Sequence, residues 1–237
     1  MKNFFSKDVI FSGVTIKSCV GFIDLVYSTT NIATMNNLES IRKYYSKFIN
    51  STSEVVKSYS GKVLKNIGGC ILFYFPKTSD INDTNSSQEA IECDFKILDE
   101  RYKINDKLAR KHLPPFNFRM SLDYGVLDLS LVGDYSQTDL FSSTLNLCSK
   151  INSSPSLSMY NEIIIGDNLY RILKSSNIVN NYYFINNDEY KIIEPNKYPT
   201  YNIRRINNHG MSITKNNNKK ELIRRIIRDI TQTGIIY

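Results

Sequence analysis

The spacing of apolar residues along the first half of the chain alternates between the two periods of regular structure. Short runs rich in β-branched and apolar residues indicate strands, and apolar positions three to four residues apart indicate amphipathic helices. Gly61 and the pair Pro114-Pro115 end the two helical stretches. The predicted elements are a strand at 14–26, a polar turn at 27–30, a helix at 35–60, a hairpin of strands 62–67 and 70–75 around Gly68-Gly69, a polar loop at 76–87 and a helix at 88–111.

The second half of the chain continues this alternation with shorter elements. The predicted elements are a pair of strands at 116–124 and 126–132 around Gly125, a helix at 139–153, a strand at 162–165, a helix capped by Asp167 and ending at Leu173, strands at 182–185 and 190–193, and a terminal helix at 222–230. The order β-α-β-β-α-β-β-α-β-α-β-β-α predicts an α/β (α+β) sandwich, with helices on one face of a mostly antiparallel sheet.

The charge of the chain is concentrated at its C-terminal end. Over 237 residues, 30 Lys and Arg against 23 Asp and Glu give a net charge of +7. Residues 204–237 carry eight of these basic residues and two of the acidic ones, a balance of +6, so residues 1–203 are nearly neutral at +1. We therefore predict a domain at 1–203 and a basic C-terminal extension at 204–237 that contains an amphipathic helix.

The helix predicted in the extension has an apolar stripe on one side and basic residues on the other, so it could bind a partner. An apolar stripe of this kind packs on its own domain or on a dimer partner more often than on a membrane. Contact of residues 216–237 with an acidic partner or a membrane surface is kept as an alternative, because a basic amphipathic helix has the right shape for it. Nucleic acid is not an expected partner, since the body shows no recognised binding motif.

Composition excludes several classes of protein. No run approaches the ~18 uncharged apolar residues of a membrane-spanning helix, and the start of the chain lacks the pattern of a secretory signal. The four Cys have no C-x-x-C spacing and indicate buried free thiols, while two His are too few for a convincing metal site or catalytic triad. We expect a cytoplasmic protein.

Four segments, in order and at suitable spacing, carry a resemblance to one family. They are VGFIDLVYST at 20–29, GKVLKNIGGCILFYF at 61–75, FRMSLDYG at 118–125 and DLFSSTLNLCSKI at 139–151. Together they resemble the catalytic domain of the class III adenylate and guanylate cyclases, over about residues 14–175. The resemblance implies a ferredoxin-like βαββαβ core, here with a C-terminal extension. Ser121 and Ser142 depart from the family pattern, which has glycine at both places.

The resemblance also implies a reaction and an assembly. In the family, the 3′-oxygen of the ribose attacks the α-phosphate of a nucleoside triphosphate, and pyrophosphate leaves. Two carboxylates hold two divalent ions, commonly Mg²⁺ or Mn²⁺, which is two-metal chemistry with hard oxygen ligands. The site lies between two chains arranged head to tail. One chain supplies the metal carboxylates, and the other supplies the residues that read the base and stabilise the transition state.

When the site residues of the family are matched one by one to this sequence, the half of the site that would hold the metal ions is incomplete. Asp24 matches the first metal carboxylate, and Ser28 and Thr29 belong to the phosphate turn that follows it. The second carboxylate position is Gly69, which has no side chain to offer. Binding of Mg²⁺ or Mn²⁺ is therefore expected to be impaired. As a structural alternative, Asp24 is an anion held by the amides of the turn, because a carboxylate in a buried strand needs partners.

The complementary half of the site is better matched. Lys65 matches the lysine that reads the adenine edge, and Asp139 matches its acidic partner. Asn146 matches the asparagine that orients the ribose. Lys150 stands where the family has an arginine that stabilises charge on the phosphates, so it keeps the charge but loses the bidentate fork. Ordinary roles also remain open for these residues: a solvated strand edge, a charge at a helix start and two solvated helix positions.

These residues favour a degenerate, adenylate-type cyclase, a pseudoenzyme or regulatory chain that binds ATP with weak or no turnover alone. It would form a head-to-tail homodimer, or a heterodimer in which it supplies the complementary half-site to a partner with both carboxylates. A first alternative is an active cyclase that makes cyclic AMP, with Asp123, Asp128 or a backbone carbonyl replacing the missing ligand. A second alternative is a non-enzymatic interaction module that docks through its basic tail.

Overall fold

The computed structural model of the chain describes residues 10–35, 37–132, 137–153, 160–187 and 198–206. These residues belong almost entirely to one compact unit, Met1–Arg204, and the second unit, Arg205–Tyr237, is described only at its first two residues. The strand predicted at 190–193, the helix predicted at 222–230 and the segment 216–237 lie outside the described residues.

Most of the predicted elements are present, and the predicted α+β fold is confirmed. In chain order the described elements are β1 (Ile10–Leu25), α1 (Ser28–Ala33), α2 (Leu38–Ser58), β2 (Lys62–Ile67), β3 (Cys70–Phe75), η1 (Pro76–Ser79), α3 (Thr84–Ala109), β4 (Phe118–Val132), β5 (Gln137–Phe141), α4 (Ser143–Ser153), β6 (Glu162–Gly166), α5 (Asp167–Lys174), η3 (Asn177–Asn181), β7 (Tyr182–Asn186) and β8 (Thr200–Arg205).

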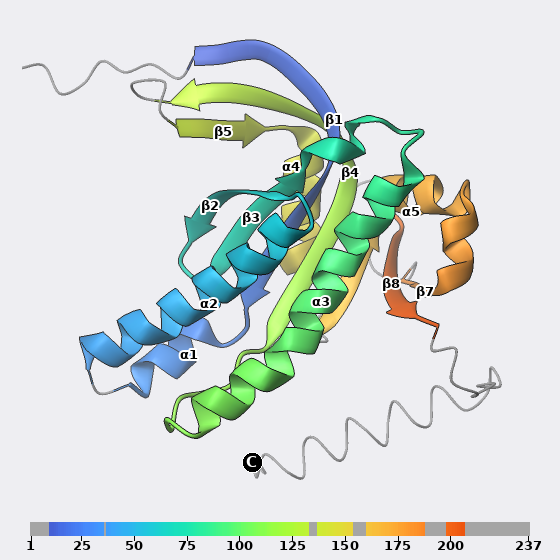
Figure 1. Cartoon of the computed structure of the whole chain (residues 1–237). Helices are drawn as coiled ribbons and strands as arrows, with labels where there is room; N and C mark the ends of the chain where they lie inside the picture. Colours follow the sequence, from blue (N-terminus) through green and yellow to red (C-terminus); the bar gives the residue numbers. More distant parts are fainter. Residues whose placement is uncertain (1–9, 36, 133–136, 154–159, 188–197, 207–237) are drawn as a thin grey trace, which may run out of the picture. The chain divides into compact units, whose positions relative to one another are not determined.

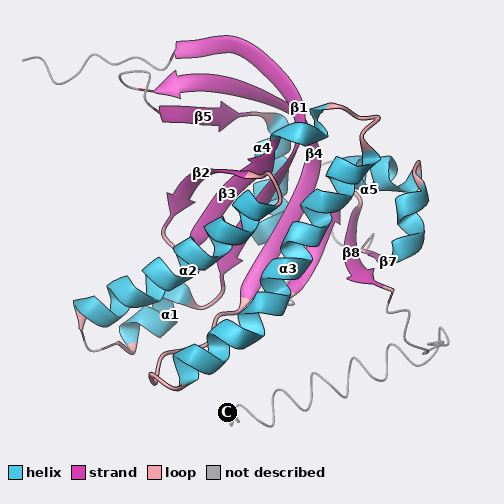
Figure 2. Ribbon diagram, viewed as in Figure 1, coloured by secondary structure: helices cyan, strands magenta, loops and turns pink. Residues whose placement is uncertain are grey.

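The described strands form one mixed, mostly antiparallel sheet (Figure 2). The order along the sheet is β2-β3-β1-β4-β6-β8-β7, and β5 pairs with β4 off this path. β1 is antiparallel to both β3 and β4, whereas β6 is parallel to β4. Because β1 runs against both of its neighbours, its C-terminal end lies beside the starts of β3 and β4.

Helices cover both faces of this sheet. The helices α2, α3 and α5 pack on the face to which Cys19 and Ile23 of β1 belong, and α4 packs on the opposite face with Val20 and Phe22. Figure 1 shows α2 and α3 side by side in front of the sheet and α4 behind it. The prediction of helices on one face is therefore wrong. The middle of β1 is apolar on both sides, as is typical of a strand that is covered on both faces.

The predicted break at Gly125 is absent. β4 continues through this residue over 15 residues and pairs with β1 along its length. Gly125 allows close packing and makes no turn, since a Cβ there would lie 2.3 Å from Oγ1 of Thr144 on α4. The residues Gln137–Phe141 form β5, so α4 begins at Ser143, later than the helix predicted at 139–153.

The remaining differences lie at the ends of elements. The polar turn predicted at 27–30 begins helix α1, and Gly166, not Asp167, is the N-cap of α5. The strand β8 is present in the structure, but the sequence analysis does not predict it. The four Cys are free, as predicted, and three of them, Cys19, Cys93 and Cys148, are buried.

Candidate functional site

Asp24 lies near the end of β1, next to a basic side chain. In the sheet it is paired with Arg119 of β4 on one side and with Cys70 of β3 on the other. Nη2 of Arg119 donates a hydrogen bond to Oδ2 of Asp24 at 2.9 Å, and the side chains of Arg119 and Asp24 are 31% and 26% exposed. The carboxylate of Asp24 is thus neutralised by a cation of its own chain, which removes the cost of an unpaired charge in a strand.

Cys70, on the other side of Asp24, is a half-buried thiol. Burial, and after it the charge of Asp24, raises the pKa of Cys70 to about 12. Without a metal ion the thiol therefore stays protonated at neutral pH, and a protonated thiol is a poor nucleophile.

Gly69 lies in the turn between β2 and β3, where the family has its second carboxylate. A Cβ at this position would lie 3.0 Å from Oγ of Ser28, so a side chain here would point toward the start of α1. The positive φ of the turn, 58°, belongs to Gly68. The carbonyl of Gly69 accepts a hydrogen bond from the amide of Leu25 at 2.8 Å, which ties this turn to the end of β1. A Cβ at position 69 would need Ser28 to shift by only a few tenths of an ångström.

The donors around Asp24 do not fit a two-metal site. Among the residues that the structure describes, no three His, Cys, Asp or Glu side chains are grouped closely enough to hold a metal ion. Asp123 is paired with Val20 of β1, four residues or about 13 Å along the strand from Asp24. Asp128 is farther still and accepts a hydrogen bond from Oγ1 of Thr15 at 2.7 Å. Neither carboxylate can replace the one missing at Gly69.

Ser28 and Thr29 lie at the beginning of α1, directly after β1. Tyr27 precedes them with a φ of 60°, which turns the chain sharply out of the strand. The side chain of Ser28 is half-buried and that of Thr29 is exposed. Ser28 is therefore the hydroxyl that lies next to Gly69, on the same side of the turn as the missing carboxylate.

Lys65 and Asp139 come from β2 and β5, which approach each other although their sheet neighbours are β3 and β4. Lys65 is half-buried on β2, where the pairing with β3 shifts by one residue between Val63 and Lys65. This shift is a β-bulge, which changes the direction of the side chains that follow it. Asp139 belongs to β5, which lies against β2, and its backbone is paired with Ser130 of β4. The side chain of Asp139 lies outside the described residues.

Asn146 and Lys150 are both exposed on α4. Residues four apart on a helix face the same way, with about 5–6 Å between their Cβ atoms. The structure thus places an amide and an ammonium group on one solvent-facing stripe of α4.

The two serines that replace family glycines have structural partners. Oγ of Ser142 accepts a hydrogen bond from the amide of Leu145 at 2.9 Å and so caps the start of α4. Oγ of Ser121, which is fully buried in β4, donates to the carbonyl of Cys148 at 3.0 Å. Both residues therefore fix α4, the helix that carries Asn146 and Lys150.

Asp24 and Asp139 are separated within one molecule. Arg119, beside Asp24, is at the start of β4, and Ser130, beside Asp139, is eleven residues or about 36 Å farther along this curved strand. One chain does not bring Asp24 and Asp139 together.

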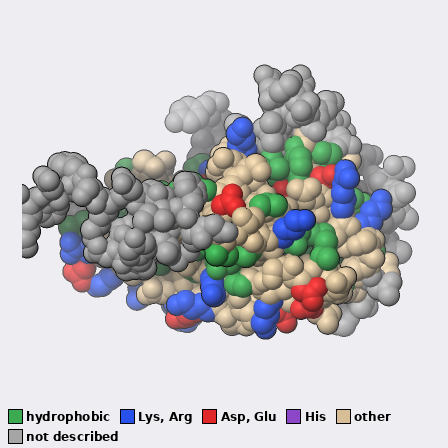
Figure 3. Space-filling model, turned by 90° about the horizontal axis from the view of Figure 1, so that it is seen from above, with side chains coloured by type: hydrophobic (Ala, Val, Ile, Leu, Met, Phe, Trp, Pro, Cys, Tyr) green, Lys and Arg blue, Asp and Glu red, His purple; other side chains and the backbone are tan. Residues whose placement is uncertain are grey.

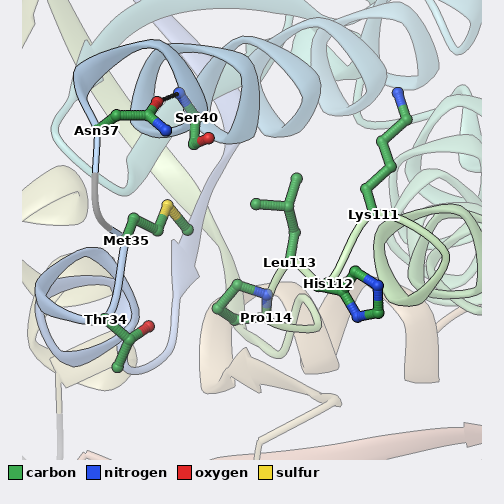
Figure 4. A pocket seen from close by; sticks show the side chains of 8 residues that line it. All are labelled: Thr34, Met35, Asn37, Ser40, Lys111, His112, Leu113 and Pro114. Carbon is green, nitrogen blue, oxygen red and sulfur yellow. Dashed lines mark hydrogen bonds between the residues drawn. The ribbon is translucent and has the colours of Figure 1, made fainter.

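The surface offers one face and one hollow for comparison with these residues. On the face shown in Figure 3, Lys and Arg are interspersed with Asp and Glu, as expected for a nearly neutral body. A hollow of about 460 Å³ lies between the connection of α1 with α2 and the end of α3 (Figure 4), and its lining includes Met35, Lys111 and Leu113. None of the predicted site residues lines this hollow.

Arg119 is the residue of this region that the sequence analysis missed. The sequence shows that Arg119 lies in the third family-like segment. It also shows that Asp24, a carboxylate in an apolar strand, needs a partner. What joins the two is the register of β1 against β4, which pairs residues 95 positions apart. A prediction of that register would have identified the ion pair.

Comparison with known proteins agrees with this fold and these segments. The family model described as the adenylate and guanylate cyclase catalytic domain matches residues 12–205. The chain therefore belongs to the family of class III adenylate and guanylate cyclase catalytic domains. In sequence, no curated protein is significantly similar to the chain.

Solved structures confirm the fold at low sequence identity. The structure of the adenylyl cyclase CyaB from P. aeruginosa superposes with a TM-score of 0.70 at 16% identity, covering 86% of this chain and all of that one. The guanylate cyclase domain of RhGC from Catenaria anguillulae, solved in complex with GTP, gives a TM-score of 0.68 at 17% identity, covering 82% of this chain and all of that one. At these identities the likeness shows the fold alone.

The described residues contain no helix that is both long and apolar enough to cross a membrane.

Proposed function

We propose that this chain is an adenylate-type member of the family that binds a nucleoside triphosphate, ATP in preference to others, and has weak or no cyclase activity by itself. The observation that supports this proposal most directly is the glycine at position 69. Its position beside Ser28 and Asp24 leaves one carboxylate where the reaction needs two. A homodimer would repeat this deficit at both of its sites.

The better-matched half-site supports a complementary role in a dimer. Lys65 and Asp139 come from β2 and β5, two strands that approach each other, and would read the base, while Asn146 and Lys150 share one face of α4 and would hold the ribose and the phosphates. Lys150 supplies a point charge in place of a guanidinium fork, which keeps the attraction to a phosphate and loses the second hydrogen bond. In a head-to-tail heterodimer, a partner with two carboxylates would complete a site with these residues.

An assay for cyclic AMP tests the proposal. Purified chain with Mn²⁺ and ATP is expected to give product near the background rate, because the loss of one ligand of a two-metal clamp costs several orders of magnitude. The Gly69→Asp variant is expected to regain turnover, and Asn146→Ala in that background is expected to abolish it again. Robust product from the unaltered chain, lost on Asp24→Ala, would show an active cyclase instead.

A further inference from the structure

We infer that the chain binds a long-chain fatty acid, as its carboxylate, in a channel along α2 and α3. The channel consists of a groove of about 590 Å³ between these two helices and of the hollow shown in Figure 4, and Lys111 and Leu113 line both. None of the predicted site residues lines the channel. The inference is therefore independent of the proposed function.

The groove has an apolar floor that suits a hydrocarbon chain. It lies between α2 and α3, which run side by side in Figure 1. Its lining includes Leu108, which is buried, and Ile104 and Leu113, which are half-buried. The rim of the groove carries lysines, whose aliphatic stems extend the apolar surface while the ammonium groups stay in water. A methylene chain that covers such a surface is stabilised by the apolar area removed from water.

The rim of the groove is basic. It carries Lys43 and Lys47 on α2 and Lys107 and Lys111 on α3, against Glu54. Lys43 has an acidic partner one turn away on α2, but no ion pair between described residues holds the other three lysines. On each helix the two lysines are four residues apart, a spacing at which like charges repel each other. In a domain that is nearly neutral, this local positive charge favours an anionic ligand.

The hollow gives the channel a polar end. Its lining includes Ser40 and His112, whose side chains can donate hydrogen bonds, and Lys111 lies where the hollow joins the groove. Figure 4 shows the side chain of Leu113 between Met35 and Lys111. A ligand with one charged end and a long apolar part would place its carboxylate at Lys111 and its chain along the floor of the groove.

The size of the channel favours a small amphiphile over a helix of a partner protein. The groove and the hollow, at about 590 and 460 Å³, are each within the range of ~300–1,000 Å³ that is typical of small-molecule sites. Ten residues line the groove, whereas a stable protein interface uses about 20–30 residues on each side. An acidic helix is the competing occupant, since its carboxylates could also meet the lysines.

The test is a fluorescence titration of the full-length chain with cis-parinaric acid, a fluorescent long-chain fatty acid, below its critical micelle concentration. We expect saturable binding and displacement of the probe by unlabelled saturated fatty acids. Their Kd is expected to fall by roughly threefold to fourfold for each added methylene until the chain fills the groove. A long-chain alcohol of the same length is expected to bind roughly tenfold more weakly, because it lacks the charge that Lys111 would meet.

Two variants locate the ligand in the channel. Lys111→Gln is expected to raise the Kd of the probe by roughly tenfold, the effect of losing a charge-assisted hydrogen bond. Ile104→Ser makes the floor polar and is expected to raise the Kd by a similar factor of roughly ten. Lys57→Gln and Ile81→Ser change exposed residues outside the channel and are the matched controls. Circular dichroism and thermal unfolding establish that each variant is folded.

Each outcome decides the inference. Absence of saturable binding, or a Kd that depends neither on chain length nor on Lys111, overturns it. Binding of a helical peptide rich in Glu and Leu, without binding of the probe, assigns the channel to a protein partner and also overturns it. If Ile104→Ser does not fold, the chain-length series and Lys111→Gln still decide. None of these outcomes bears on nucleotide binding, because the predicted site residues do not line the channel.

Discussion

The fully buried carboxylate of Asp123 makes a quantitative prediction about stability and pH. Its Oδ1 accepts hydrogen bonds from the amides of Tyr124 at 2.8 Å and Leu169 at 3.3 Å, and its Oδ2 accepts one from the hydroxyl of Tyr198 at 2.8 Å. A Cβ on Gly166 would lie 2.3 Å from this carboxyl group, so the glycine makes room for it. Asp123 thereby joins β4 to the start of α5 and to the residues before β8.

Burial raises the pKa of Asp123 from 3.8 to about 6, against the opposing effect of its three hydrogen bonds. A raised pKa means that the folded state binds the proton more tightly than the unfolded state. The stabilisation by this proton is complete below about pH 4 and is lost as the pH rises through about 6. With 1.36 kcal/mol per unit, the contribution of Asp123 to the free energy of unfolding falls by about 3 kcal/mol over this interval.

The test is urea unfolding of the wild-type chain and of Asp123→Asn at several pH values between about 4 and 7.5. The variant keeps an oxygen for the two amides and cannot titrate, so the difference in unfolding free energy between the two proteins is expected to change by about 3 kcal/mol across the range. Tyr198→Phe removes the donor that favours the charged form and is expected to move the change to higher pH. A difference that stays constant within the ~10–15% error of extrapolation would refute the reasoning.

Further predictions concern the packing of α4 and the basic extension. Gly125→Ala is expected to lower the free energy of unfolding by about 1–3 kcal/mol through the clash with Thr144, and Thr144→Ala is expected to recover most of the loss in urea unfolding. Ser142→Ala removes the cap of α4 and is expected to cost about 1 kcal/mol, measured as a lower Tm. Deletion of residues 216–237 is expected to abolish co-sedimentation with anionic liposomes if the basic extension contacts membranes; equal sedimentation of the two chains would exclude that role.

The sequence was most informative where the physical signal is local. The hairpin at Gly68-Gly69 and the long helices α2 and α3 follow from turn chemistry and apolar spacing, which depend on neighbouring residues. Gly125 misled the prediction because a glycine in a strand marks either a turn or a close approach of another element. Only the position of Thr144 on α4, which is a tertiary contact, separates these two cases.

The residues of the candidate site also fall into two groups: those that a local sequence motif identifies and those that only a tertiary contact identifies. Asp24, Lys65, Asn146 and Lys150 could be located from motifs, since each lies within a short family-like segment. Arg119 could not be assigned to Asp24 from the sequence, because their contact depends on the pairing of two strands distant in the chain. Asp123 is a second example. The sequence shows the aspartate, but it does not show that the carboxylate accepts hydrogen bonds from the amide of Leu169 on α5 and from the hydroxyl of Tyr198.

On the proposed function, one half-site of this chain keeps its base-reading residues and the other lacks a carboxylate, and this difference bears on how the chain would assemble. On the proposed function, a homodimer would contain two identical sites, each with a good base-reading half and a metal half occupied by an ion pair. A heterodimer with a chain that has both carboxylates would contain one complete site and one site that lacks the carboxylate at Gly69. Activity in a titration of such a partner with this chain would then rise to a maximum at equal amounts and would depend on Asn146. An activity that never exceeded that of the partner alone would leave this chain a binding subunit.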